Sequence, residues 1–172
     1  MRKEQAILTQ LEGIPASYPA VEGVTGSALA VAWQRIEYHI AFRYTPRSVE
    51  WRVLSTGCEF IPPLAPVTGI EIQVGDDAPY SPETGPLGGY ILPCGLVTIT
   101  GSVGAGPAPA AVLEAVRRYA KYIESGSKLP VGVNRFSSGD ADVSIRGDQV
   151  SPSMAMANSG AGDLLRPFRR VF

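Results

Sequence analysis

The chain has 172 residues, the length of one compact domain, with 45% hydrophobic and 18% charged residues and a formal net charge of -1. This balance excludes a protein that holds nucleic acid through an overall basic field. No apolar run approaches the roughly 18 residues of a membrane span, and two cysteines allow at most one bridge, which excludes a disulfide scaffold or zinc finger. We expect a soluble protein made in a reducing compartment.

Helical periodicity dominates the first quarter of the chain. A weak helical pattern covers residues 3–11 and ends before Gly13 and Pro15. A stronger amphipathic helix is predicted from Ser27 to about residue 42, where apolar residues recur every three or four positions. Its apolar stripe consists of Leu29, Trp33, Ile36 and Ile40.

The middle of the chain, residues 48–103, changes to the alternating pattern of strands. Strands are predicted at 49–53, 70–74 and 96–100, with a long loop rich in proline and glycine near residues 75–90. The product should be a small, mostly antiparallel sheet. This stretch is also locally acidic, through Glu59, Glu71, Asp76, Asp77 and Glu83.

The strongest predicted helix begins at Pro109 and extends to about residue 125. Its apolar stripe consists of Val112, Val116, Tyr119 and Ile123, and its basic side consists of Arg117, Arg118 and Lys121. After it, a short strand is predicted at 143–145 and a short helix after Ser151. The fold class is α+β: two to three helices packed with a small, mostly antiparallel sheet, long Pro/Gly-rich loops and an extended C-terminal arm. Residues 1–150 should form a single domain and 151–172 the arm.

Candidate catalytic chemistry is weak throughout. Gly101, Gly104 and Gly106 stand between a strand and a helix, but their spacing matches neither a P-loop nor a dinucleotide-binding turn. The single histidine, His39, has arginines four residues to either side and no local carboxylate; they should lower its pKa. Two cysteines, Cys58 and Cys94, are interpreted as small buried hydrophobic residues. We therefore predict no catalytic residue, no metal ligand and no cofactor.

The C-terminal segment combines apolar and basic residues after two glycines. The set comprises Leu164, Leu165, Arg166, Phe168, Arg169 and Arg170. Either this segment is a tail that folds back onto the domain or frays, or it is a docking peptide whose apolar anchors fill a partner's pockets while its arginines pair with acidic groups.

Taken in order, several segments resemble the head–tail connector (adaptor) proteins of tailed bacteriophages. The resemblance extends over residues 28–172 and depends on the order and spacing of the pieces rather than on one motif. They are ILPCGLVTITG at 91–101, PAAVLEAVRRYA at 109–120, GDADVSI at 139–145 and LLRPFRR at 164–170.

This resemblance implies a structural virion protein and no enzyme. Such connectors form a homo-oligomeric ring, commonly a dodecamer, under the portal protein, and their other side receives the next neck protein, a stopper or tail terminator. It implies a location in the virion neck after synthesis in the bacterial host cytoplasm, transient non-specific contact with genomic DNA in the lumen, and no membrane. The C-terminal set becomes the candidate portal-docking site.

For the ring itself, we expect the basic side of the 109–125 helix to meet acidic strands and loops of a neighbouring subunit. Two alternatives stay open. One is a small ligand-binding or enzymatic α+β domain that uses the loop from Gly101 to Gly106, and the other is a different neck protein, such as a stopper or tail-completion protein.

Overall fold

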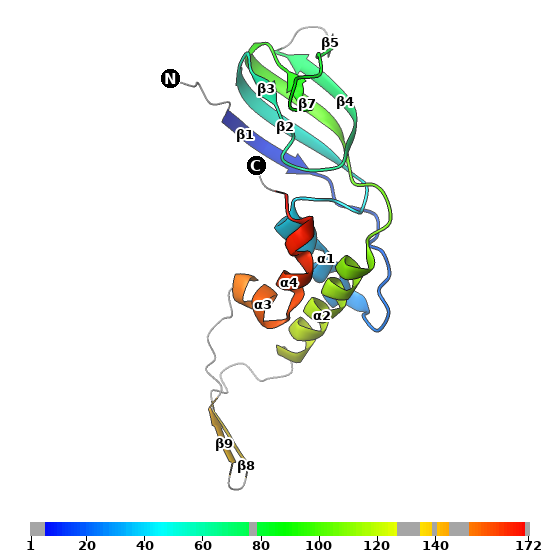
Figure 1. Ribbon diagram of the computed structural model, residues 1–172, viewed down its shortest axis with the longest axis vertical. Helices are drawn as coiled ribbons and strands as arrows, with labels where there is room; N and C mark the ends of the chain where they lie inside the picture. Colours follow the sequence, from blue (N-terminus) through cyan, green and yellow to red (C-terminus); the bar gives the residue numbers. More distant parts are fainter. Residues whose placement is uncertain (1–5, 76–78, 127–134, 139–140, 145–151, 171–172) are drawn as a thin grey trace. The chain divides into compact units, whose positions relative to one another are not determined.

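The computed structural model describes residues 6–75, 79–126, 135–138, 141–144 and 152–170. Its helices and antiparallel sheets make an α+β fold, as predicted from the sequence (Figure 1). The chain divides into two compact units, each built from separate segments. The sheet unit comprises Met1–Tyr18, Ala41–Pro107 and Arg170–Phe172, and the helical unit comprises Pro19–Ile40 and Ala108–Arg169. The predicted domain boundary at 150/151 lies outside the described residues.

The sheet unit contains a five-stranded antiparallel sheet with the order β1-β2-β7-β4-β5. These strands are β1 (Ala6–Glu12), β2 (Arg47–Thr56), β7 (Cys94–Val103), β4 (Val67–Val74) and β5 (Pro79–Tyr80). A second, two-stranded sheet joins β3 (Glu59–Phe60) to β6 (Tyr90–Ile91). The strands predicted at 49–53, 70–74 and 96–100 are confirmed and lie next to one another in the order β2-β7-β4.

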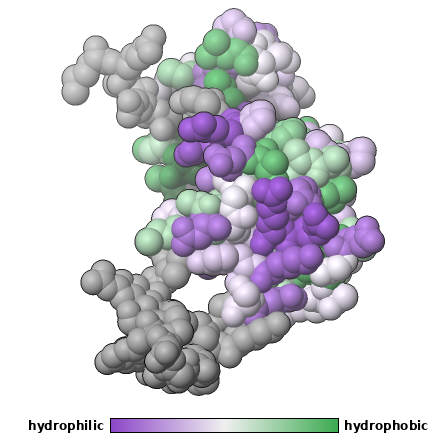
Figure 2. Space-filling model, turned by 60° about the horizontal axis from the view of Figure 1, so that its bottom comes forward, coloured by the Kyte–Doolittle hydropathy of each residue, from purple (hydrophilic) through white to green (hydrophobic). Residues whose placement is uncertain are grey.

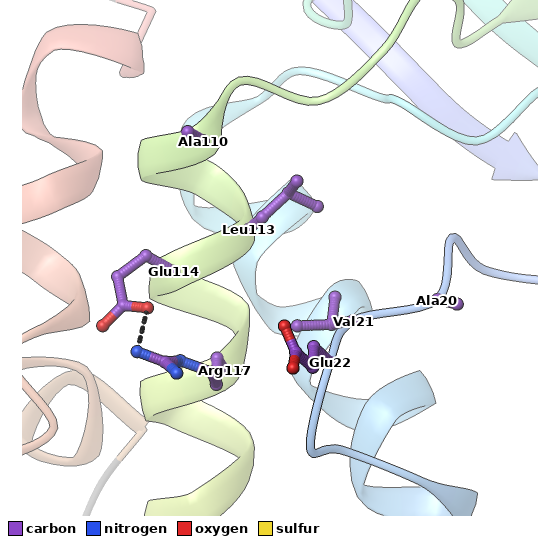
Figure 3. A pocket seen from close by; sticks show the side chains of 7 residues that line it. All are labelled: Ala20, Val21, Glu22, Ala110, Leu113, Glu114 and Arg117. Atoms are coloured by element: carbon purple, nitrogen blue, oxygen red, sulfur yellow. Dashed lines mark ion pairs between the residues drawn. The ribbon is translucent and has the colours of Figure 1, made fainter.

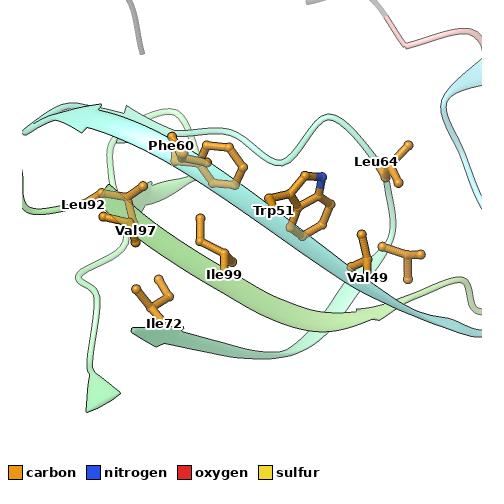
Figure 4. Close-up of a cluster of buried hydrophobic side chains, with 10 residues drawn as sticks. Val49, Trp51, Phe60, Leu64, Ile72, Leu92, Val97 and Ile99 are labelled. Carbon is orange, nitrogen blue, oxygen red and sulfur yellow. The ribbon is translucent and has the colours of Figure 1, made fainter. Parts of the chain in front are cut away.

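One face of β2, β7 and β4 carries the core of the sheet unit. On β2, Val49, Trp51 and Val53 are buried while their neighbours in sequence are not, as strand alternation requires. Val53 belongs to the same buried cluster as the side chains labelled in Figure 4, which are those of Val49, Trp51, Phe60, Leu64, Ile72, Leu92, Val97 and Ile99. Trp51 meets Phe60 edge to face, with ring centroids 6.0 Å apart. Its indole Nε1 donates to the side-chain oxygen of Gln10 on β1 at 2.9 Å.

The weak helix predicted over residues 3–11 is wrong, because the described part of that stretch, residues 6–11, belongs to strand β1. Six of the seven β1 residues are exposed, so no alternation of burial marks the segment as a strand. Its conformation comes from pairing with β2, and a register shift falls between Ile7 and Thr9. Tertiary pairing here overrides local helix propensity.

The ion pair at the end of β1 is largely enclosed. Glu12 accepts two hydrogen bonds from the guanidinium of Arg43, at 2.7 and 2.9 Å, and Arg47 lies 3.8 Å away. The Arg43 side chain is only 3% exposed and that of Glu12 is 22% exposed. Burial alone would raise the pKa of Glu12, but the hydrogen bond and charge of Arg43 outweigh it, and the pKa is lowered.

The last residues of the segment predicted as a long loop near residues 75–90 are held by one carboxylate. Glu59 on β3 accepts backbone hydrogen bonds from Leu87, at 3.0 Å, and from Gly89, at 2.6 Å. A Cβ at Gly89 would clash with the backbone of Phe60, so this close approach requires glycine. The Glu59 carboxylate therefore has a structural role within the acidic stretch.

Neither cysteine forms a disulfide and both are exposed, which contradicts the buried positions expected for them. Cys94 begins β7 and pairs in register with Thr56, the last residue of β2. Cys58 follows the turn at Gly57, after β2 has ended. Both lie where the strands end, so the apolar neighbours in their sequence do not enclose them.

The helical unit contains four helices and a closing turn among the described residues: α1 (Gly26–Ile40), α2 (Ala110–Gly126), α3 (Pro152–Asn158), α4 (Ala161–Leu165) and η1 (Arg166–Phe168). The helices predicted from Ser27 and from Pro109 are confirmed as α1 and α2, which pack together. The short helix predicted after Ser151 is confirmed as α3. A two-stranded sheet, β8 (Arg135–Ser138) with β9 (Ala141–Ser144), is paired only within itself among the described residues. It includes part of the predicted 143–145 strand.

Buried side chains recur at helical spacing on both long helices. Ala32, Trp33, Ile36 and Ile40 are fully buried on α1, and Val112, Ala115, Val116, Tyr119 and Ala120 are buried on α2. The indole Nε1 of Trp33 donates to the carbonyl of Pro19 at 2.9 Å, which fixes the chain that leads into α1. After Ile40, Ala41 adopts a positive φ of 55°, and α1 ends.

The glycine loop after β7 gives a first testable prediction. Gly104 has a φ of +99°, and a Cβ there would clash with the backbone carbonyl of Thr45, whereas Gly106, with a φ of +82°, faces open space. We expect Gly104→Ala to lower the free energy of unfolding by about 2 kcal/mol and Gly106→Ala by about 1 kcal/mol. Urea denaturation checks this, and equal losses would contradict the proposed close approach.

Candidate assembly surface

The C-terminal residues expected to form an extended arm are instead helical. Gly160, with a φ of 69°, precedes α4, and η1 follows it directly. Ala161 and Leu165, four residues apart, are both fully buried within the helical unit, where α4 packs against α2. Of the two alternatives left open by the sequence, the segment folds back in this structure.

The six predicted docking residues are therefore not equivalent. Leu165 contributes to the core of the helical unit, whereas Arg166 and Arg169 are exposed, and Leu164 and Phe168 are half-buried. Arg170, the last residue described, belongs to the sheet unit, where its Nη1 donates to the carbonyl of Pro62 at 3.3 Å. The docking role of the set stays a prediction. In this conformation Arg166 and Arg169 are open to a partner, Leu164 and Phe168 are partly open, and Leu165 is enclosed.

The three residues expected at a subunit interface lie on the outer side of α2, where all are exposed. Two of them share one acidic partner: Arg117 and Arg118 lie 2.6 and 2.8 Å from the carboxylate of Glu114. The hydrogen bond from Arg118 is the largest influence that lowers the pKa of Glu114. Lys121 makes no ion pair with another described residue. The basic side of α2 thus carries less net charge than its three cations alone suggest.

A shallow pocket of about 330 Å³ adjoins this side of α2 (Figure 3). It lies between α2 and the segment that precedes α1, and it is lined by Ala20, Val21, Glu22, Ala110, Leu113, Glu114 and Arg117. Two of these residues are acidic and one is basic, so the pocket has no excess of positive charge. Figure 2 shows one large area of strongly hydrophilic side chains on the face it displays, with smaller hydrophilic patches apart from it and apolar side chains nearby.

Two further pockets lie side by side in the helical unit, where the C-terminal turn meets α1 and α3. Their volumes are about 450 and 310 Å³, and both are lined by His39, Ser153, Met156 and Arg169. Burial lowers the pKa of His39 below its ordinary value, and the positive charge of Arg169 lowers it further. The direction of this shift agrees with the sequence prediction, but its causes are burial first and the charge of Arg169 second, rather than the arginines four residues away on either side.

Sequence reasoning missed that α1 and the C-terminal turn share these pockets. Arg35 and His39, four residues apart on one helix, were visible as a pair, but their proximity to Arg169 depends on how α4 packs. Arg43, four residues after His39, was expected on the same face of the helix. It lies beyond the end of α1 and binds Glu12 in the sheet unit.

The glycine loop does not line any of these three pockets. Gly101 belongs to β7, and the tight conformation at Gly104 is explained by the approach of Thr45. Within the described ranges, no group of three or more histidine, cysteine, aspartate or glutamate residues could hold a metal ion. No helix in the same part of the chain is long and apolar enough to cross a membrane.

Comparison with known proteins gives a likeness of fold. No family model matches this sequence, and no curated protein matches it. The chain is similar to a solved structure described as "Neck of native GTA particle computed with C12 symmetry". The similarity covers 85% of this chain and 81% of that chain, with a TM-score of 0.53 and 22% sequence identity.

Proposed function

We propose that this chain is a structural protein of the neck of a phage-like particle. The observation that carries the proposal is its likeness in fold, over 85% of its length, to a neck component of a GTA particle, a gene transfer agent. The order and spacing of the segments at 91–101, 109–120 and 164–170 add support, because they resemble head–tail connectors. More narrowly, the protein is an adaptor under the portal, which joins the capsid vertex to the next neck protein.

In this proposal the working form is a ring of twelve copies with genomic DNA in its lumen. The twelvefold symmetry of the similar neck supports the copy number. Heterologous contacts close into a ring when the rotation from one subunit to the next permits it. We place the basic side of α2, with Arg117, Arg118 and Lys121, against exposed acidic residues of a neighbour's sheet unit, which include Glu71 and Glu83.

Charge reversal on α2 tests this contact. We expect the triple substitution Arg117→Glu, Arg118→Glu and Lys121→Glu to keep the protein monomeric under conditions where the wild type forms the ring, as measured by light scattering. The side chains of Arg117 and Arg118 are 45% and 48% exposed, so the helix should persist, and circular dichroism checks that it does. Arg52→Glu, an exposed change in the sheet unit, is the control. A ring that forms unchanged with the triple variant overturns this interface.

Recruitment by the portal tests the adaptor role. The mass of the tag-free chain is measured by light scattering alone and after mixing with the portal protein of the same particle. A multi-copy complex supports the adaptor, and recruitment by tail protein alone indicates a stopper or tail-completion protein. We expect Arg166→Gln combined with Phe168→Ala to weaken portal binding, since these side chains are accessible in the folded chain.

A further inference from the structure

We propose that the paired pockets between α1, α3 and the C-terminal turn bind a carboxylate-bearing side chain from an acidic segment of another protein. This inference rests on the proposed function, since it names the chemistry by which a partner in the particle would be recognised. The site is defined by Arg35 and His39 on α1, by Arg166 and Arg169 in the C-terminal turn, and by an apolar wall that includes Met156. We call it the arginine pocket.

The charges around the arginine pocket are unbalanced. Three arginines line it, against a single carboxylate, that of Asp163. Among the described residues, none of these arginines lies within ion-pair distance of a carboxylate, whereas the arginines of α2 and β2 each have such a partner. In a chain whose formal net charge is -1, this is a local concentration of unpaired cations. A carboxylate that enters would form charge-assisted hydrogen bonds with the guanidinium groups.

The shape of the pocket favours a side chain on a polypeptide over a nucleic-acid backbone. Its wall includes Met156, Ala157 and Tyr119, which can pack against the methylene groups of a glutamate or against apolar residues beside it. A phosphate backbone is held by cations along an extended track. Here the cations surround two cavities of about 450 and 310 Å³. The occupant we assign is therefore an acidic, partly apolar peptide segment of a partner protein.

His39 gives a direct readout, because it is the only histidine in the chain. The groups that line the pocket around it are Arg35, Arg166, Arg169, Asp163 and the Ser153 hydroxyl, with Tyr38 and Tyr119. A carboxylate bound among them favours the protonated imidazole, since an opposite charge nearby stabilises the charged form. Occupation of the pocket should raise the pKa of His39.

The experiment is an NMR titration of the His39 ring in the tag-free, full-length chain. The probe is N-acetylated, C-amidated hexaglutamate, and hexaglutamine is the uncharged control. We expect hexaglutamate to shift the His39 resonance saturably and to raise its pKa by about half a unit or more, while hexaglutamine does neither. Arg35→Gln and Arg169→Gln should each weaken binding about tenfold. Arg52→Gln, in the sheet unit, should leave it unchanged.

Three results would overturn the proposal. One is an unchanged His39 resonance at millimolar hexaglutamate, and another is binding that survives both pocket substitutions. The third is a larger shift of the His39 resonance with another occupant than with hexaglutamate. That occupant is either a short DNA duplex or a second copy of the chain, tested by raising the protein concentration without peptide. Ring formation and portal binding are measured separately by light scattering. A failed pocket with an intact ring rejects only this inference, and a working pocket without assembly rejects only the proposed function.

Discussion

Leu165→Ala is expected to lower the free energy of unfolding of the helical unit by about 2–5 kcal/mol, the range for a leucine that leaves a cavity in a packed core. Leu165 is fully buried in α4, which packs against α2. The chain has two tryptophans, and each unit contains one. In a Trp51→Phe background, the fluorescence of Trp33 follows the helical unit during urea denaturation, and in a Trp33→Phe background Trp51 follows the sheet unit.

The neighbouring substitution Leu164→Ala provides the matched control, since its side chain is only half-buried and should cost about 1 kcal/mol or less. Equal losses from the two changes would contradict the packing of α4. This prediction bears on how docking is tested. A truncation after Ser159 removes α4 together with the proposed docking residues, so its effect on portal binding would mix lost contacts with a destabilised helical unit.

Glu12→Gln is expected to destabilise the sheet unit by about 3 kcal/mol at neutral pH, the lower end of the range for a broken buried ion pair, because Glu12 is 22% exposed. The change leaves the buried guanidinium of Arg43 without its carboxylate partner. Glu50→Gln is the control: its partner Arg52 is 57% exposed, so its loss should be small. A similar cost for both substitutions would overturn this assignment.

The same carboxylate makes stability depend on pH. The pKa of Glu12 is lower in the folded chain than its ordinary value. Its stabilising contribution is therefore complete above the unfolded pKa of about 4.3 and is lost as the pH falls through the folded pKa. We expect the difference in unfolding free energy between wild type and Glu12→Gln to shrink as the pH falls from about 5 to 3. A difference that stays constant over this window would contradict the prediction.

The sequence predicted those elements whose buried residues recur at the regular spacing of a strand or a helix. On β2 the order of Val49, Trp51 and Val53 among polar neighbours was sufficient, and on α2 the recurrence of Val112, Val116 and Tyr119 was sufficient. Strand β1 could not be found in this way. Its side chains are mostly exposed, so its conformation depends on its pairing partner rather than on its own pattern.

In the candidate sites, too, the local sequence predicted the composition but not the tertiary packing. That the C-terminal segment combines leucines and arginines is plain from its composition, but the two leucines differ in burial only because α4 presents one of them to α2. The proximity of Arg35 and His39 to Arg169 depends on packing between residues more than a hundred positions apart in sequence. The exposure of both cysteines depends on where the strands end, which local composition does not define.

The interleaved connectivity of the two units has a consequence for protein synthesis. All strands of the five-stranded sheet have been translated once Val103 is complete, although α1 interrupts them in the sequence. Helix α2, which packs against α1, is translated only afterwards. During synthesis the strands of the sheet can therefore pair while Trp33 and Ile36 are not yet covered by the residues that pack against them. Chaperones that bind exposed apolar helices would meet this protein during that interval.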